Sequence, residues 1–103
     1  MEQKKCFIKG QWLSTTQILP VHSPWSGEVV GEVSLAGAEE WDAAIVAAQK
    51  AGEVLRKWSS QQRRQLLEAM AAGVKARRDE FVQTIVAEGG KPVTYARAEM
   101  ARG

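Results

Sequence analysis

The chain has 103 residues, a formal net charge of +2 and one cysteine. This length allows one small domain with little margin for a buried core, and basic residues scattered among acidic ones argue against nucleic-acid binding. Because no apolar run approaches the ~20 residues of a membrane span, and the polar start lacks the pattern of a signal peptide, we expect a cytoplasmic protein with no membrane partner.

The N-terminal third predicts short strands joined by turns. Residues 1–5 are polar, and we expect them to be frayed. Phe7-Ile8 and Trp12-Leu13 are two short apolar runs on either side of Gly10, a pattern typical of a β-hairpin.

Two further extended pieces follow the hairpin. The first, 18–21, contains Pro20, which cannot donate to a ladder and so restricts the strand to a sheet edge. Residues 23–27 then carry an early proline and a late glycine, as turns do. The run 28–33 after this turn is rich in valine and predicts another strand.

The periodicity becomes helical from Ala36 onward. Glu39 and Glu40 fall in a predicted first turn, where acidic charge suits the helix dipole. Apolar positions recur at three, four and seven residues and predict one stripe: Trp41, Ala44, Ile45, Ala48 and Leu55. The alanines in it favour close packing against another element over a cofactor pocket.

The next helix is predicted from Ser59, which forms a capping box with Gln62. Its apolar positions have helical spacing: Leu66, Leu67, Met70 and Val74. Its outer side is basic: Arg63, Arg64, Lys75, Arg77 and Arg78. A solvated face is favoured over a nucleic-acid patch, because no aromatic platform or glycine loop lies among these charges.

Two more helices complete the chain. Asp79 is a predicted cap for a helix that carries Phe81, Val82, Ile85 and Val86. Gly89 or Gly90 supplies the positive φ that ends this helix, and Pro92 suits the first turn of the next. We therefore predict an α+β chain, mainly helical, with strands and turns in 1–35 and one antiparallel helical stack in 36–103.

The residues alone predict no catalytic, cofactor-binding or metal site. Cys6 and His22 offer no spacing for a nucleophile and its base, and both are expected to be structural. No His or Cys cluster has metal-ligand spacing. Gly27 has no helix immediately after it, and Gly89-Gly90 follows a helix, so neither matches a dinucleotide-binding turn.

Several stretches, in order, resemble the N-terminal region of the aldehyde dehydrogenase superfamily. The resemblance runs from about residue 7 to the end of the chain and is carried by Phe7-Ile8-Lys9-Gly10-Gln11-Trp12, Ser23-Pro24-Trp25-Ser26-Gly27-Glu28 with the strand after it, Asp42-Ala43-Ala44-Ile45, Arg63 with Leu66-Leu67, and Glu88-Gly89-Gly90-Lys91-Pro92. Two positions depart from the family pattern. Ser23 replaces an asparagine, and Leu55 stands where a tryptophan is usual.

The resemblance implies NAD(P)-dependent oxidation of an aldehyde to a carboxylic acid in a homo-oligomer with a Rossmann-like cofactor-binding domain. In this family a cysteine thiolate attacks the aldehyde, hydride passes to the nicotinamide, and a glutamate-activated water releases the acid. The groups that do this lie beyond the matched segment. Cys6 is expected to precede the opening hairpin and is not the family nucleophile. Glu88 matches a carboxylate near a structural cation of some members, but a helix-end role is favoured.

We therefore expect 1–103 to be an incomplete N-terminal part of an aldehyde dehydrogenase domain. Alone it should be inactive and bind no cofactor, with the rest of the dehydrogenase chain as its partner. The alternative is a stand-alone helical interaction module that binds a protein through the alanine-rich stripe of 41–55. Exposed apolar surface would favour the first hypothesis.

Overall fold

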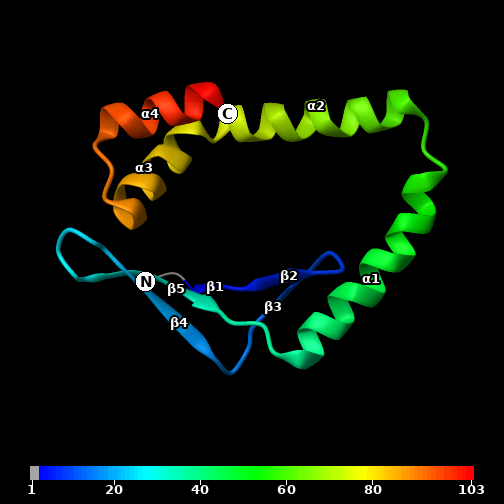
Figure 1. Ribbon diagram of the computed structural model, residues 1–103, viewed down its shortest axis with the longest axis horizontal. Helices are drawn as coiled ribbons and strands as arrows, with labels where there is room; N and C mark the ends of the chain where they lie inside the picture. Colours follow the sequence, from blue (N-terminus) through cyan, green and yellow to red (C-terminus); the bar gives the residue numbers. More distant parts are fainter. Residues whose placement is uncertain (1–2) are drawn as a thin grey trace. The chain divides into compact units, whose positions relative to one another are not determined.

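A computed structural model of the protein describes residues 3–103. Its strands are β1 (Gln3–Lys4), β2 (Cys6–Ile8), β3 (Gln11–Leu13), β4 (Ile18–His22) and β5 (Val29–Ser34). Its helices are α1 (Ala38–Arg56), α2 (Ser60–Ala76), α3 (Arg78–Gly89) and α4 (Val93–Arg102) (Figure 1). The predicted class, α+β and mainly helical with short N-terminal strands, is confirmed. Within 3–103, none of the helices has the length and apolar character that a membrane crossing requires.

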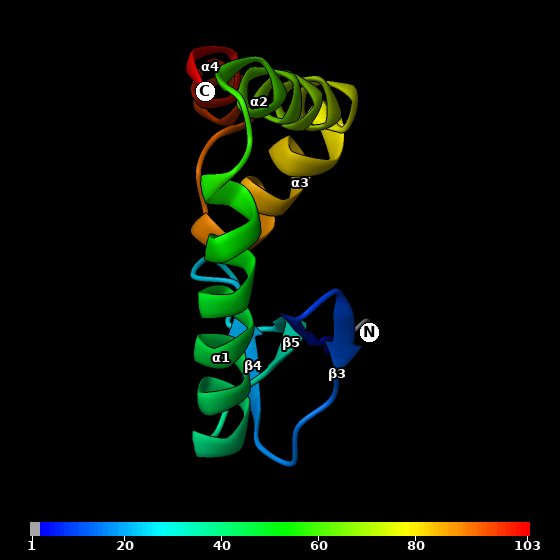
Figure 2. The same cartoon turned by 90° about the vertical axis from the view of Figure 1, so that its right-hand side faces the viewer.

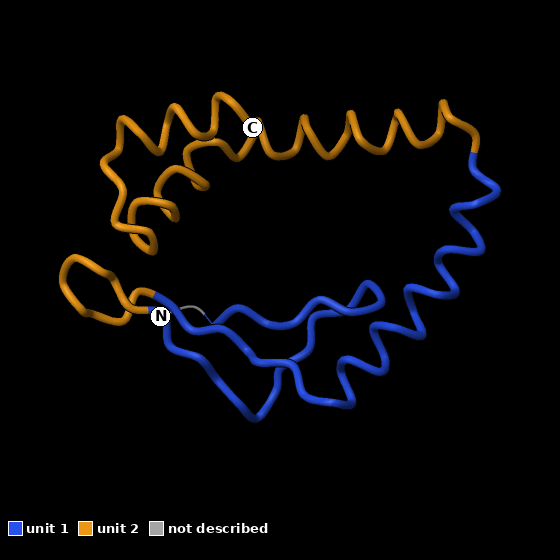
Figure 3. Tube along the Cα trace, in the orientation of Figure 1, with its two compact units in different colours: residues 1–21, 31–58 blue, residues 22–30, 59–103 orange. Residues whose placement is uncertain are grey.

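The chain divides into two compact units (Figure 3). Unit 1 holds the chain up to Val21 together with Gly31–Trp58, and unit 2 holds His22–Val30 together with Ser59–Gly103. Helix α1 therefore belongs with most of the strands, whereas α2, α3 and α4 belong to unit 2. The prediction of one antiparallel stack for all the helices is wrong, because α1 packs on a strand of the hairpin instead.

The predicted β-hairpin is confirmed in unit 1. Strands β2 and β3 are antiparallel, with Cys6 opposite Leu13 and Phe7 opposite Trp12. The rings of Phe7 and Trp12 lie 4.6 Å apart between centroids, a cross-strand aromatic pair that stabilises the hairpin. Lys9 (φ 53°) and Gly10 (φ 74°) form its two-residue turn, and two positive φ values match the right-handed twist of the strands.

The other strands form a sheet in the order β1-β5-β4. Pro20 lies in β4 at the edge, as predicted. β1 runs parallel to β5, with Gln3 opposite Glu32, so the expectation of a frayed start is wrong for residues 3 and 4. Residues 1 and 2 lie outside the described part. The side-chain amide of Gln3 also donates to Oγ of the buried Ser34 at 3.1 Å, which helps to hold β1 in place.

Helix α1 begins after its cap residue Gly37, whose backbone N–H donates to the Glu40 carboxylate at 2.8 Å. It runs as one unbroken helix (Figure 2). Its alanines face the hairpin and, with Phe7, Ile8 and Lys9, line a groove of about 340 Å³: Ala44, Ala47, Ala48 and Ala51. Trp41 and Ile45, in contrast, stay 63% and 61% exposed. The close packing expected of the whole stripe is therefore wrong in part, because Ala44 is half-buried whereas Trp41, Ile45, Ala48 and Leu55 stay exposed.

In unit 2 the predicted capping box of α2 is confirmed: Gln62 N–H donates to Ser59 Oγ at 3.1 Å, and Ser59 N–H donates to Gln62 Oε1 at 2.9 Å. Asp79 is not the cap of α3. The helix starts at Arg78, after the cap residue Arg77. Asp79 lies in its first turn, where its charge still suits the helix dipole. Gly90 ends α3 in the left-handed conformation with φ 67°, as predicted.

Helices α3 and α4 pack on each other. Their contact buries Val82 to 5% exposure and Ala96 completely. Ala96 has no side chain beyond Cβ, and this small residue lets the two helices approach closely. Pro92 is the cap of α4 and lies immediately before its first residue.

Candidate functional site

Uncovered apolar surface is the most prominent chemical feature of this molecule. Among residues 3–103, the buried apolar side chains are Val82 and Ala96. Soluble monomers rarely leave large apolar areas exposed unless those areas bind something. The arrangement is that of a segment which docks onto a larger surface and does not carry a core of its own.

The clearest such surface lies on α2 and is called here the α2 apolar face: Leu66, Leu67, Met70 and Val74. These are the positions that the helical spacing predicted as apolar, and all are exposed, Leu67 to 64%. A stripe this regular on a helix is normally the side that packs. Within the part of the chain that the structure describes, no residue buries it.

The turn after β4 is held by a serine hydroxyl. Ser23 Oγ accepts hydrogen bonds from the backbone N–H groups of Trp25 at 3.2 Å and Ser26 at 3.3 Å. Ser23 N–H donates to the Glu28 carbonyl at 2.8 Å, closing the loop. A short side-chain acceptor is what an asparagine would also supply here. The serine that departs from the family pattern therefore keeps the turn.

Within unit 2 this turn lies against the turn between α3 and α4. A Cβ atom placed on Gly90 would come within 2.7 Å of Pro24 Cγ, closer than real contacts allow. Gly90 also has φ 67°, a conformation that L-residues rarely adopt. Glycine is thus required at residue 90 for two independent reasons, one local and one tertiary.

The same turn is tied to α4 by an ion pair. Lys91 Nζ lies 2.6 Å from Glu99 Oε2, with both side chains a little under half exposed. The hydrogen bond from Lys91, and then its charge, lower the pKa of the Glu99 carboxyl below its ordinary value of 4.5, and Arg102 contributes to a smaller extent. The pair joins the residue after the left-handed Gly90 to the middle of the next helix.

This ion pair predicts a measurable acid response. Replacing Lys91 with methionine is expected to raise the pKa of Glu99 toward 4.5, because the donor and its charge are lost. Since the folded pKa is depressed, the pair stabilises the α3–α4 turn above the ordinary carboxyl pKa, and this contribution is lost as pH falls through the folded value. A carbon-detected NMR titration of Glu99 in both proteins measures the shift. An equal pKa in the two would contradict it.

The basic side of α2 is partly neutralised by its own carboxylates. Arg64 Nε lies 2.8 Å from Glu68 Oε1. Arg77 forms two hydrogen bonds with Glu80, at 2.8 and 2.6 Å, which raise the pKa of the guanidinium. Such pairs favour a solvated helix face over a nucleic-acid patch, since the charges of Arg64 and Arg77 are already paired.

The two candidates for nucleophile and base lie in structural hydrogen bonds. Cys6 Sγ donates to the Ser34 carbonyl at 3.5 Å. It is the first residue of β2, so the expectation that it precedes the hairpin is wrong. His22 Nδ1 lies 3.0 Å from the Gly27 carbonyl oxygen. Because a carbonyl only accepts, this nitrogen carries the proton and the ring supports the turn.

Glu88 lies in the last turn of α3 and is exposed. Residues 3–103 contain no group of three His, Cys, Asp or Glu side chains that could hold a metal ion. The helix-end role expected of Glu88 stays a prediction.

Comparison with known proteins identifies the family. The sequence profile of the aldehyde dehydrogenase family matches residues 12–103. The chain belongs to the aldehyde dehydrogenase family. It is 33% identical over 96 residues to succinate-semialdehyde dehydrogenase [NADP(+)] 2 of Schizosaccharomyces pombe, covering 91% of this chain and 20% of that protein. It is 37% identical over 95 residues to 1-pyrroline-5-carboxylate dehydrogenase of Bacillus pumilus, covering 91% of this chain and 18% of that one.

Solved structures agree with this assignment. The 1-pyrroline-5-carboxylate dehydrogenase of Thermus thermophilus superimposes with a TM-score of 0.92 and 34% identity, over 96% of this chain and 19% of that chain. This aldehyde dehydrogenase chain thus spans about a fifth of the length of the relatives it matches. Its fold is that of the corresponding part of a complete dehydrogenase.

Sequence reasoning missed the two contacts that organise unit 2. The contact of Pro24 with Gly90 and the ion pair of Lys91 with Glu99 both involve the Gly-Gly-Lys-Pro run, which the resemblance singled out as a motif. The motif marked the place, but nothing in its spacing named the partners. For Pro24, the only signal in the sequence was its place in a turn that resembles the family pattern.

Proposed function

We propose that this chain is the N-terminal part of an NAD(P)-dependent aldehyde dehydrogenase that oxidises an aldehyde to a carboxylic acid, and that its own role is structural. The uncovered apolar surface carries the proposal: among residues 3–103 the buried apolar side chains are Val82 and Ala96, and such a segment needs a larger partner. The TM-score of 0.92 to one fifth of a complete dehydrogenase supports the rest of that chain as the partner. The proposal includes a cytoplasmic homo-oligomer.

The cofactor is expected outside this chain. The Schizosaccharomyces pombe relative is named for NADP(+), and a Thermus 1-pyrroline-5-carboxylate dehydrogenase, 34% identical, has bound NAD. The one connection here from a strand to a helix by way of a glycine is β5 to α1, which contains Gly37. Its N–H is already bonded to the Glu40 carboxylate, and that negative charge would repel a pyrophosphate. The described residues therefore do not fit a dinucleotide site.

The catalytic residues are likewise expected outside this chain. Cys6 and His22 bond to backbone carbonyls and form no nucleophile–base pair. A dehydrogenase of this kind needs a thiolate nucleophile and donors for the oxyanion. We expect this chain to contribute the surfaces that position the catalytic domain and no catalytic residue.

Two assays test the proposal. The purified 103-residue chain, with succinic semialdehyde and either NAD or NADP, is expected to give no rise in absorbance from reduced cofactor. A chimaera in which this chain replaces the matching first fifth of the Thermus thermophilus enzyme is expected to fold and to oxidise that enzyme's own substrate. Cofactor reduction by the isolated chain, or a folded chimaera without activity, would contradict the proposal.

A second candidate is a stand-alone interaction module that binds a protein through α1. The exposure of Trp41 and Ile45 favours it, because large apolar side chains on one helix face are typical binding anchors. This hypothesis requires a cooperatively folded isolated chain. Broad thermal unfolding together with strong binding of an apolar dye would reject it in favour of the dehydrogenase segment.

A further inference from the structure

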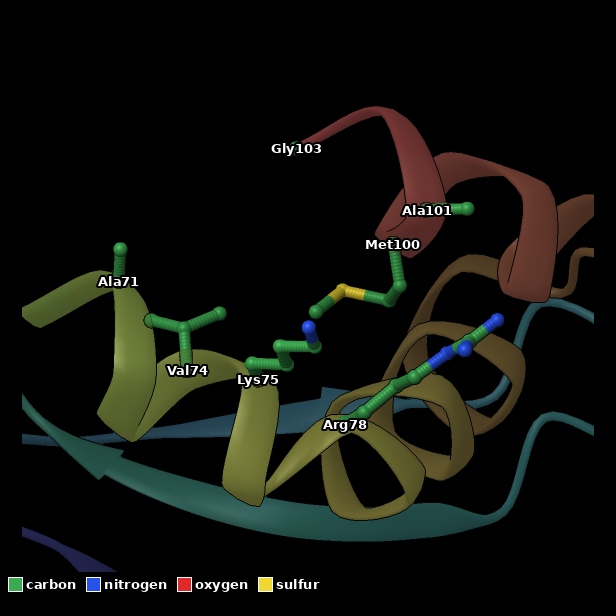
Figure 4. Close-up of a pocket in the computed structure, with 7 residues that line it drawn as sticks. All are labelled: Ala71, Val74, Lys75, Arg78, Met100, Ala101 and Gly103. Atoms are coloured by element: carbon green, nitrogen blue, oxygen red, sulfur yellow. The ribbon is translucent and has the colours of Figure 1, made fainter.

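Unit 2 contains a pocket of about 530 Å³ between the last turns of α2, the start of α3 and the end of α4 (Figure 4). Its apolar walls come from α2 and α4: Ala71, Val74, Met100 and Ala101. Lys75, Arg78 and Gly103 complete the lining. Figure 4 shows the Lys75 side chain reaching toward Met100, while Arg78 rises from the start of α3.

The charges of this pocket are unbalanced. Lys75 and Arg78 are exposed, and neither has a side-chain hydrogen bond or ion pair with any residue of 3–103. No Asp or Glu side chain lines the pocket. Arg64 and Arg77 on the same stretch, in contrast, each have a glutamate partner. Two unpaired cations beside apolar walls favour an occupant that is both anionic and apolar.

We propose that this pocket is an intramolecular docking site for an acidic, apolar segment of the same dehydrogenase chain outside residues 1–103. This inference rests on the proposed function. An apolar side chain of that segment fills the space between Val74 and Met100, and a neighbouring carboxylate pairs with Lys75, with the guanidinium of Arg78 as a second cation beside it. The Arg78 guanidinium can bind a carboxylate through two parallel hydrogen bonds, whereas the Lys75 ammonium acts as a point charge.

The length of the relatives supports this occupant. This chain matches about a fifth of each curated relative, so some four fifths of such a protein lies outside it. The pocket is also large enough for one or two side chains, because its volume lies within the range of roughly 300–1,000 Å³ at which sites enclose small ligands. A second copy of the chain, the other possible occupant, is separated by the experiment below.

The test uses the chimaera with the Thermus thermophilus enzyme and a water-soluble carbodiimide, which joins an amine directly to a carboxylate in contact with it. Mass spectrometry is expected to find Lys75 joined to an aspartate or glutamate outside residues 1–103 of the same chain. The link is expected to be lost in Lys75→Arg, which keeps the charge but has no reactive amine. Lys91 and Glu99, 2.6 Å apart, supply an internal positive control.

Each outcome bears on the inference. A Lys91–Glu99 link without any Lys75 link overturns it, as does a Lys75 link to a residue within 1–103. Mixing isotopically labelled and unlabelled chains shows a link between copies, which also overturns it. An active chimaera without the Lys75 link leaves the proposed function standing and removes only the docking site. A folded but inactive chimaera removes both.

A matched pair of variants adds a second readout. Lys75→Gln with Arg78→Gln is expected to lower the melting temperature of the chimaera and to weaken its dependence on salt, because an intramolecular charge pair is lost. Lys50→Gln with Arg97→Gln removes the same charge from exposed cations that do not line the pocket and have no side-chain partner among residues 3–103, and is expected to change neither. Equal behaviour of the two double variants would overturn the proposal.

Discussion

Replacing Gly90 with alanine is expected to destabilise unit 2 by at least about 2 kcal/mol, one of the two largest effects we predict. The left-handed conformation costs a residue with Cβ roughly 1–2 kcal/mol. The new methyl group also meets Pro24 Cγ at 2.7 Å, so one of the two turns must move. Denaturant unfolding of the chimaera, followed by circular dichroism, measures the loss of unfolding free energy.

Gly89 is the matched control for this prediction. It is the last residue of α3, its φ lies outside the left-handed region, and a Cβ there would meet nothing within 4 Å. Gly89→Ala is therefore expected to be neutral or to stabilise by about 0.5 kcal/mol, since alanine restricts the unfolded chain. If both substitutions had the same cost, the Pro24 contact would not be responsible.

Replacing Leu67 with alanine is expected to have opposite outcomes in two settings. In the isolated chain Leu67 is 64% exposed, so the helical circular-dichroism signal and its urea dependence should hardly change. In the chimaera the α2 apolar face is expected to be buried against the rest of the dehydrogenase, and truncating a buried leucine costs about 3 kcal/mol. The difference between the two settings measures docking directly.

Gln65 provides the comparison on the same helix. It lies roughly on the opposite side from the α2 apolar face, given 3.6 residues per turn. Gln65→Ala is expected to change the unfolding free energy by less than about 0.5 kcal/mol in the chimaera. A loss at Leu67 no larger than the loss at Gln65 would show that the α2 apolar face remains exposed in the complete enzyme.

Local features of the fold were predictable because their causes lie within a few residues. The hairpin follows from two apolar runs around Gly10, the α2 start from Ser59 and Gln62, and the end of α3 from the glycine pair. In each case a backbone preference or a short-range hydrogen bond fixes the element. The order of these elements was also enough to identify the family.

Predictions failed where distant groups meet. Residues 3–4 gave no strand signal, yet β1 pairs with β5 because the edge of β5 offers it backbone partners. The stripe of α1 predicts one packed face, yet only Ala44 of it is half-buried beside the hairpin, and Trp41 and Ala48 stay exposed. Helical periodicity marks the apolar positions of a helix but does not say which of them a neighbour will cover.

By itself the sequence determined the class of the fold, the family and the order of the elements, since these depend on local chemistry and on matching motifs. Only the tertiary structure decided that Pro24 contacts Gly90, that Lys91 pairs with Glu99, and that Lys75 and Arg78 share a pocket without an Asp or Glu side chain. These contacts join different turns and helices of the chain. Their geometry is set by how helices and turns pack, which no local spacing encodes.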